Sequence, residues 1–300
     1  MTFHRREKTM AKERTGHSVE SRKTKMIHAV IFLLLATLAF LTVYPVIYIL
    51  FGSFKTNNEL VRGGVNLLPQ KFILDNYKQA WEMANFSRYT LNSLVLSFGV
   101  MAVSLTVSSM AGYVFSRKEF KLKSLIYNSM VMFMFINVGS VALRPLFELA
   151  VKLHMNKSLI SIILISAGGG QATYVFLIHG FMNSIPKEMD EAAKIDGCSF
   201  FGIYYRVILP VIKPALASVA LLSFRGGWNE YILPLIFTMT NEKLRPLTVG
   251  VVALQNAGDG AAAWNILFAG SAIAIVPIIL VYMAASKQFM GGMTAGAVKG

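Results

Sequence analysis

The chain is 300 residues long, with 55% hydrophobic residues, only 15% charged residues and a mean hydropathy of +0.54. A soluble domain of this size carries more charge, and apolar runs of about 20 residues can cross about 30 Å of hydrocarbon, so composition excludes a soluble protein and predicts an integral membrane protein. The formal charge of +14 does not indicate nucleic-acid binding, because the excess basic residues lie between the apolar runs, where anionic lipid and membrane topology account for them.

The first 26 residues form a basic segment, with eight Lys or Arg residues against three Glu. Because such a segment cannot bury enough apolar surface to fold, it is predicted to be a disordered cytoplasmic tail over 1–26. An apolar run follows over 27–51. It is longer than the apolar part of a secretory signal and no small-residue cleavage site follows it, so we interpret it as a retained signal-anchor helix.

An amphipathic stretch over 54–88 separates this run from further apolar segments. Together with 27–51, these segments predict six membrane-spanning helices, and the further ones lie at about 89–115, 124–150, 158–182, 211–238 and 262–286. The predicted fold class is an all-α membrane protein with one helical domain over 27–290 and a short C-terminal tail over 291–300. An even number of spans places both termini on the same side.

Basic residues predict which side that is. The segments 1–26, 116–123, 183–213 and 287–300 together hold eighteen Lys and Arg residues, whereas the loops on the opposite side hold nine. Cytoplasmic loops carry the excess of Lys and Arg, so both termini and the segment 183–213 are predicted to be cytoplasmic.

The predicted spans contain many helix breakers, which are Pro45, Pro145, Pro234, Pro277 and the run Gly168, Gly169, Gly170. Irregular helices are tolerated in lipid where neighbouring helices or a water-filled cavity satisfy the freed backbone groups. The pattern therefore favours a bundle around a pathway over a passive anchor.

One charged segment, Asn183 to Pro210, interrupts the apolar chain. Ser184 is expected to cap a first helix, and Gly197 to end that helix in the left-handed conformation. Ser199 is expected to cap a second, mostly apolar helix that ends at Pro210. Helices of about ten residues are too short to be stable alone in water, so both must pack on something.

The first of these helices is predicted to be amphipathic, with an apolar face made of Ile185, Met189, Ala192 and Ala193. A cytoplasmic loop folded back on its own bundle is the simplest interpretation. A DNA-binding helix-turn-helix is disfavoured, because the segment lies between membrane spans.

The letters EAAKIDG, followed by VILP, resemble the coupling motif of ABC importer permeases, which reads EAA, three residues, Gly, nine residues, I-x-L-P. The matching residues are Glu191, Ala192, Ala193, Gly197, Leu209 and Pro210, with Val207 where the motif has Ile. Two more segments, SFRGGWNEYILPLIF over 223–237 and GGMTAGAVKG over 291–300, are similar to segments of the carbohydrate-uptake (maltose-type) permeases. The resemblance covers 27–300.

This resemblance implies a type I ABC importer permease (MetI-like) fold with cytoplasmic coupling helices at about 185–210. In the family, the motif Glu pairs with a basic residue of a separate ATPase, and that Glu is Glu191 here. The ATPase-coupling residues it implies are Glu191, Ala192, Ala193, Asp196, Gly197, Leu209 and Pro210. The implied partners are a second, distinct permease, two ABC ATPase subunits and an extracytoplasmic solute-binding protein, with the chain in the bacterial cytoplasmic (inner) membrane.

The chain shows no nucleotide site of its own. The phosphate-binding pattern G-x-x-x-x-G-K-[ST] is absent, and Gly168–Gly170 lie within an apolar run with no Lys after them. ATP and Mg²⁺ are therefore expected on the partner ATPase. Cys198 is the only cysteine and the five histidines are scattered, so no metal site, catalytic residue or cofactor is predicted, and the chain is not expected to be an enzyme.

Charged residues within the predicted spans cost a few kcal/mol each on insertion scales, about 2.5 to 3.5 at the bilayer centre. They either line a pathway or neutralise one another. The candidate translocation path comprises Arg144, Arg225, Trp228, Asn229 and Glu230, because aromatic rings stack on sugars and polar groups bind their hydroxyls. A basic path would suit acidic sugars. In the structural interpretation, Arg144 pairs with Glu148 and Arg225 with Glu230. Both interpretations stay open.

The predicted function is a transmembrane permease subunit of an ATP-driven, binding-protein-dependent importer for sugars or oligosaccharides. One alternative is an ABC permease for a non-sugar solute such as a polyamine or phosphate. The other is an ion-driven secondary transporter, which needs no ATPase docking site.

Overall fold

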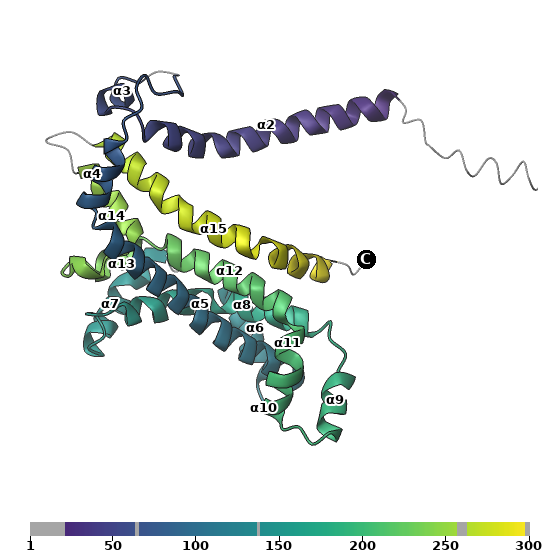
Figure 1. Cartoon of the computed structure of the whole chain (residues 1–300). Coiled ribbons are helices and arrows are strands. Elements are labelled where there is room, and N and C mark those ends of the chain that lie inside the picture. The colour runs from purple at the N-terminus through teal and green to yellow at the C-terminus, as the bar shows by residue number, and fades with distance from the viewer. Residues whose placement is uncertain (1–21, 64–65, 137–138, 257–262, 298–300) are drawn as a thin grey trace, which may run out of the picture. The chain divides into compact units, whose positions relative to one another are not determined.

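Every regular element is a helix in the residues that the computed structural model describes, which are 22–63, 66–136, 139–256 and 263–297 (Figure 1). The predicted all-α fold class is therefore confirmed. The chain divides into two units, residues 1–49 and residues 50–300.

The first unit contributes most of one long apolar helix, α2 (Arg22–Gly52), which is long and apolar enough to cross a membrane. The hydroxyls of Thr37 and Thr42 donate to the carbonyls of Leu33 and Leu38, each at 2.8 Å. These polar groups are therefore satisfied within the helix, as a lipid environment requires. The apolar run at 27–51 predicted this helix.

Four long helices form the frame of the second unit, and they are α5 (Phe86–Arg117), α8 (Leu159–Met182), α12 (Lys213–Asn229) and α15 (Trp264–Ala297). α5 packs along α8 and α12, and α12 packs in turn on α15 (Figure 1). α5 is therefore the helix around which the bundle is assembled.

Glycines bring α5 and α8 close together. A Cβ atom on Gly99 would lie 2.6 Å from Ile163 Cδ1, and one on Gly112 would lie 2.5 Å from Ile178 Cγ2. Real Cβ atoms essentially never approach other atoms this closely, so a side chain at either position would force Ile163 or Ile178 to shift. Small residues at helix interfaces are the usual means of close helix packing in membranes.

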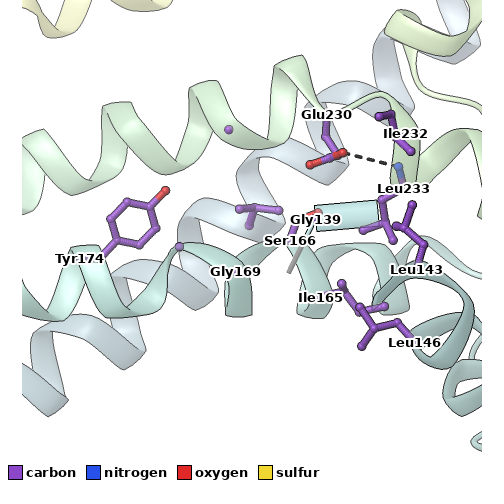
Figure 2. A pocket seen from close by; sticks show the side chains of 13 residues that line it. Gly139, Leu143, Leu146, Ile165, Ser166, Gly169, Tyr174, Glu230, Ile232 and Leu233 are labelled. Atoms are coloured by element: carbon purple, nitrogen blue, oxygen red, sulfur yellow. Dashed lines mark hydrogen bonds between the residues drawn. The ribbon is translucent and has the colours of Figure 1, made fainter. Parts of the chain in front are cut away.

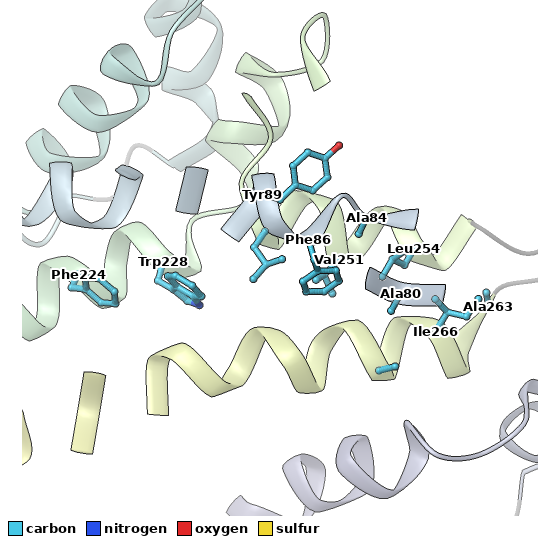
Figure 3. Packing of buried hydrophobic residues seen from close by; sticks show 12 residues of the cluster. Ala80, Ala84, Phe86, Tyr89, Phe224, Trp228, Val251, Leu254, Ala263 and Ile266 are labelled. Carbon is cyan, nitrogen blue, oxygen red and sulfur yellow. The ribbon is translucent and has the colours of Figure 1, made fainter. Parts of the chain in front are cut away.

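Buried apolar side chains gather in three clusters along α5. The first joins the start of α5 to α12, α14 (Leu247–Ala253) and α15, and Figure 3 shows Phe86, Trp228 and Val251 of this cluster. The second cluster lies at the opposite end of α5 and includes Tyr113, Ile178, Tyr204 and Ile208. The third lies beside the middle of α5 and includes Leu96, Val100, Ile162 and Leu233.

Short helices connect this frame. Before α5 lie α3 (Asn57–Val61) and α4 (Asp75–Met83), within the stretch expected to be amphipathic. The remaining short elements outside 183–211 are α6 (Lys123–Phe133), η1 (Gly139–Ala142), α7 (Leu143–Lys152), α13 (Ile232–Phe237), η3 (Glu242–Leu244), α14 and η4 (Leu254–Asn256).

Two of the expected spans are broken into shorter helices, which agrees with the irregularity that their prolines predicted. The run 124–150 divides into α6, η1 and α7, and the run 211–238 divides into α12 and α13 at Tyr231. Each restarted helix has a proline in its first turn, Pro145 in α7 and Pro234 in α13. Proline fits there because the first backbone N–H groups of a helix have no partner within it.

Four helices of the described residues are long and apolar enough to cross a membrane, at Thr24–Gly52, Phe86–Arg117, Leu159–Met182 and Trp264–Met283. A fifth is added if Phe200–Val211 and Lys213–Asn229, bent by 79°, count as one span. The predicted number of six therefore stays a prediction. So does the division into tail, membrane domain and C-terminal tail: most of 1–26 lies outside the described residues, and 291–297 continue α15.

Candidate coupling surface and solute cavity

α9 (Glu188–Ile195) carries the EAA residues. Glu191 and Ala192 are exposed on it, whereas Ala193 is buried. Of the predicted apolar face, Ile185 and Ala193 are buried in the chain, whereas Met189 and Ala192 are exposed. Consecutive helix positions lie about 100° apart, so Ala193 packs against the bundle while its two predecessors stay available to a partner.

α9 begins four residues after the predicted cap, Ser184. The Ser184 hydroxyl donates to the Phe181 carbonyl at 2.7 Å and so satisfies the end of α8 instead. Lys187 precedes α9 and makes no side-chain cap. Three acids in the first turn stabilise this start, because they face the positive end of the helix dipole.

The turn after α9 confirms the predicted role of Gly197, whose φ is +83°. Its N–H donates to the Lys194 carbonyl at 3.1 Å, and the N–H of Cys198 donates to the Ala193 carbonyl at 3.0 Å. This pair of bonds is a Schellman motif, which closes a helix on a left-handed residue. Asp196, just before the glycine, is exposed.

The second coupling helix starts as predicted, because Ser199 Oγ accepts a hydrogen bond from the N–H of Gly202 at 3.1 Å. The helix comprises α10 (Phe200–Ile203), a π-helical turn η2 (Tyr204–Ile208) and α11 (Leu209–Val211). Pro210 has no backbone N–H to donate, and its ring crowds the carbonyl of Arg206. The π-helical turn Tyr204–Ile208, which is wider than an α-helical turn, contains Arg206. Leu209 is half-buried and Pro210 exposed.

The two coupling helices and the end of α5 enclose a surface hollow of about 200 Å³. Arg117 of α5 and Asp190 of α9 meet in it as an ion pair, with 3.0 Å between Nε and Oδ2. The sequence analysis did not predict this pair, because it used Arg117 only as one of the basic residues of 116–123 and gave Asp190 no partner. The one signal available was the place of Arg117 at the end of an apolar run.

Apolar side chains of the two coupling helices are exposed. Ile195 is 87% exposed, and Phe201 and Tyr205 are each 60% exposed. Together with Glu191 and Ala192 they form the coupling surface, a patch of apolar residues with one acid. Aromatic and apolar anchors surrounded by polar groups are typical of the centre of a protein–protein interface.

A second hollow, the solute cavity, lies beside the middle of the bundle. Its volume is about 510 Å³, and its described lining comprises Val100, Gly139, Leu143, Leu146, Ile165, Ser166, Gly169, Gly170, Tyr174, Gly226, Glu230, Ile232 and Leu233. Figure 2 shows Tyr174 at one end, Leu143 and Leu146 at the other, and Ser166 and Glu230 between them. The cavity is therefore apolar at one end and polar in its middle.

The break between α12 and α13 places Glu230 in this cavity. Its backbone is extended, and its carboxylate Oε1 accepts a long hydrogen bond of 3.5 Å from the N–H of Leu233. The hydroxyl of Thr248 donates to the Glu230 carbonyl at 2.7 Å and holds the break. Glu230 is the only charged residue in the described lining.

The other polar groups of the cavity were not foreseen. Ser166 Oγ is buried and makes no hydrogen bond within the described part of the chain. Gly170 admits the ring of Tyr174, because a Cβ there would lie 2.6 Å from Tyr174 Cε2. The glycine run that was read only as a helix breaker therefore lines the cavity through Gly169 and Gly170.

The five residues predicted for a translocation path do not come together. Trp228 is buried in the first cluster, and Arg225 and Asn229 are exposed. Arg144 forms the expected ion pair with Glu148, at 3.0 Å between Nε and Oε1, in an exposed position. Arg225 makes no ion pair with Glu230 in the described residues. Their roles in transport stay predictions, and only Glu230 lines the solute cavity.

Within the described residues, no three His, Cys, Asp or Glu side chains come together as ligands for a metal ion.

Comparison with known proteins agrees with this architecture. Residues 104–291 match the family described as binding-protein-dependent transport system inner membrane component. The chain is 31% identical over 269 residues to the arabinooligosaccharides transport system permease protein AraQ of Halalkalibacterium halodurans, covering 88% of this chain and 94% of the relative. It is 34% identical over 272 residues to the galactooligosaccharides transport system permease protein GanQ of Bacillus subtilis, covering 90% and 94%.

A solved structure shares the fold. It is a chain of a bacterial ABC transporter involved in the import of the acidic polysaccharide alginate, with a TM-score of 0.77 and 23% identity, covering 90% of this chain and 98% of the other. The expected importer-permease fold is confirmed by this likeness.

Proposed function

Because this chain belongs to the family of binding-protein-dependent transport inner-membrane components, we propose that it is the permease subunit of an ATP-driven importer for sugars or oligosaccharides. The observation that carries the proposal is the likeness along nearly the full chain to permeases named for arabino- and galactooligosaccharides. Such permeases are transport proteins and not enzymes. ATP and Mg²⁺ are proposed to bind to a separate ATPase subunit.

The coupling surface is the proposed docking site for that ATPase. Glu191 is exposed one turn from the exposed Ile195, so one acid and one apolar side chain face outward together. An apolar contact that a partner covers can anchor the complex, and a charge pair beside it fixes its orientation. Two ATPase subunits and a second, distinct permease would complete the membrane complex, with both termini of this chain in the cytoplasm of a bacterium.

The solute cavity is the proposed part of the transport route within this chain. Its volume of about 510 Å³ lies within the range of small-molecule sites, about 300 to 1,000 Å³. The Glu230 carboxylate and Ser166 hydroxyl can accept hydrogen bonds from sugar hydroxyls, and the Tyr174 ring offers an apolar face. A basic path for acidic sugars receives no support here, since Arg225 does not line the cavity.

The transport cycle follows from these two regions. ATP binding would close the ATPase pair, move the docked coupling helices and turn the bundle outward. An extracytoplasmic binding protein would then deliver the sugar. On this proposal, movement of α9 opens the cavity toward the outside, so that the sugar can enter it.

One experiment tests the proposal as a whole. The complex is co-purified through this chain, its subunits are identified by mass spectrometry, and it is reconstituted with its binding protein in proteoliposomes. Uptake of neutral oligosaccharides that requires ATP supports the proposal. Uptake of a polyamine or phosphate instead, or uptake driven by an ion gradient without ATP, refutes it and selects one of the alternatives.

A further inference from the structure

The last turn of α5 holds α9 through a buried pair of charges. The Arg117 side chain is 6% exposed and the Asp190 side chain 16%, with 3.0 Å between Nε and Oδ2. Arg117 Nη2 also donates to the Ile185 carbonyl at 3.0 Å, and the Tyr113 hydroxyl donates to Asp190 Oδ1 at 3.4 Å. Two successive turns of α5 therefore grip the start of α9.

The same part of α5 holds the second coupling helix. The Tyr113 ring stacks on the Phe200 ring with 4.7 Å between centroids, and the Lys118 ammonium lies 4.6 Å from the centre of that ring. One turn earlier, the hydroxyls of Ser109 and Tyr204 share a hydrogen bond of 2.7 Å. Both coupling helices are thus fastened to one helix that is distant from them in sequence.

α5 also reaches the solute cavity. Its residue Val100 lines the cavity, and 17 positions separate Val100 from Arg117. At 1.5 Å per residue this is about 25 Å of helix. α5 contains no proline and runs unbroken over 32 residues, whereas the span at 211–238 is broken at the cavity. A displacement at Asp190 would therefore reach the cavity through α5 as a rigid rod.

Adjacent acids of α9 have opposite surroundings. Asp190 turns inward and is paired within this chain, whereas Glu191 is exposed to a partner. A buried ion pair costs desolvation and is weak evidence for added stability, but it fixes a specific arrangement, and an unpaired buried charge is costly. Such a pair would hold α9 in one register against α5 while a partner pulls on its other face.

We propose that Arg117 and Asp190 are positioning residues that transmit the movement of the coupling helices to α5, and through α5 to the solute cavity. This inference rests on the proposed function, because it requires an ATPase at the coupling surface. The ion pair of Arg117 and Asp190, called the brace below, makes α9 and the end of α5 move as one rigid body.

The test measures the ATP hydrolysed per solute imported by the complete importer in proteoliposomes. Asp190→Asn and Arg117→Gln should each reduce uptake by tenfold or more while ATP hydrolysis changes by less than threefold. The charge-swapped double variant Arg117→Asp with Asp190→Arg should recover uptake to within threefold of the original protein. Recovery distinguishes the ion pair from a general structural role, because a fold damaged at both positions would not recover.

Glu119→Gln is the matched control. Glu119 lies two residues from Arg117 and pairs with Lys123 at 2.7 Å, but its side chain is 87% exposed. The hydrogen bond and charge of Lys123 hold the pKa of the Glu119 carboxyl below its ordinary value. Losing it should leave the ATP-to-solute ratio unchanged, because an exposed pair contributes little.

A second variant tests the brace without removing it. Ser116 Oγ donates to Asn183 Oδ1 at 3.1 Å, so cysteines at these two positions, in a Cys198→Ala background, can be joined by a short bis-methanethiosulfonate reagent, from which each thiolate displaces a sulfinate. If α5 and the segment leading into α9 move as one body, the crosslinked importer should retain uptake within threefold.

The outcomes separate the two proposals. An unchanged ATP-to-solute ratio in both single variants, a charge swap that recovers nothing in an assembled complex, or loss of uptake on crosslinking overturns the brace alone. An original complex that imports no saccharide with ATP overturns the proposed function, and the brace with it.

Discussion

The coupling end and the solute cavity both lie along α5, but their polar groups are partnered differently. At the coupling end the charges of Arg117 and Asp190 meet each other, and the hydroxyls of Ser109 and Tyr204 share a hydrogen bond. In the cavity, Ser166 Oγ is buried without a hydrogen bond in the described part of the chain. Arg117 Nε and Asp190 Oδ2 also make no hydrogen bond in the described residues, so their contact is electrostatic. The contrast is that the charges at the coupling end face each other, whereas the Ser166 hydroxyl lines the cavity and keeps capacity for a ligand.

Reversing a charge on the outer face of the coupling end should have the largest effect. Glu191→Lys should lower uptake by about 100-fold, because it places a like charge against the basic residue expected on the ATPase, and like charges in an interface cost several kcal/mol. The amount of protein in the membrane should stay unchanged, because Glu191 is exposed. Uptake in vesicles and a blot of the membrane fraction measure the two.

The control for this change is Glu188→Lys, the same reversal on an exposed acid one turn earlier in α9. It should cost clearly less uptake. Equal losses in both variants would mean that general charge, and not Glu191, matters at this surface.

Removing the charge of the cavity should have the next largest effect. Glu230→Gln should raise the KM for the saccharide about tenfold, since hydrogen bonds to a charged group contribute about 1.5 to 3 kcal/mol. The amide oxygen can still accept from the N–H of Leu233, so the start of α13 should persist. Glu242→Gln, the same change on an exposed residue outside the cavity lining, should leave KM unchanged. A KM unaffected by Glu230→Gln would contradict a role in binding.

Adding one methyl group to each region compares their packing directly. Gly112→Ala at the coupling end should destabilise the protein by about 1 to 3 kcal/mol, because the new Cβ would lie 2.5 Å from Ile178. Gly169→Ala in the cavity meets nothing within 4 Å, so it should be neutral or slightly stabilising, since alanine favours helix more than glycine. Thermal unfolding in detergent measures both, and equal shifts would remove the packing contrast.

Local features of the coupling end were predictable from the sequence, whereas its attachment was not. Gly197 and Ser199 act as predicted, because a left-handed glycine and a cap depend on residues a few positions away. Ser184 is not a cap, because α9 begins only at Glu188, four residues later, and the Ser184 hydroxyl donates to the Phe181 carbonyl. The pairing of Arg117 with Asp190 joins positions far apart in the chain, and neither spacing nor hydropathy indicates it.

The cavity was less predictable still. Apolar residues lie on both sides of the polar stretch 225–230 within 211–238, so the pattern does not show that the helix stops before Tyr231. This break places Glu230 in the cavity. The glycine run at 168–170 signalled irregularity, but α8 continues through it as a helix and uses the missing side chains to form a wall. Sequence therefore indicates the residue types of a pathway without the geometry that assembles them.

The smallest effect is expected where sequence reasoning left two interpretations open. Arg144 and Glu148 form the i, i+4 pair of the structural interpretation, with side chains 89% and 57% exposed. Exposed pairs contribute about 0.2 to 1 kcal/mol, so Arg144→Gln should change the unfolding free energy by less than about 1 kcal/mol and uptake by less than twofold. Glu148→Gln should match it, because either change breaks the same pair. A tenfold loss of uptake in Arg144→Gln but not in Glu148→Gln would instead assign the arginine to the transport route, because loss of the ion pair alone would affect uptake equally in both variants.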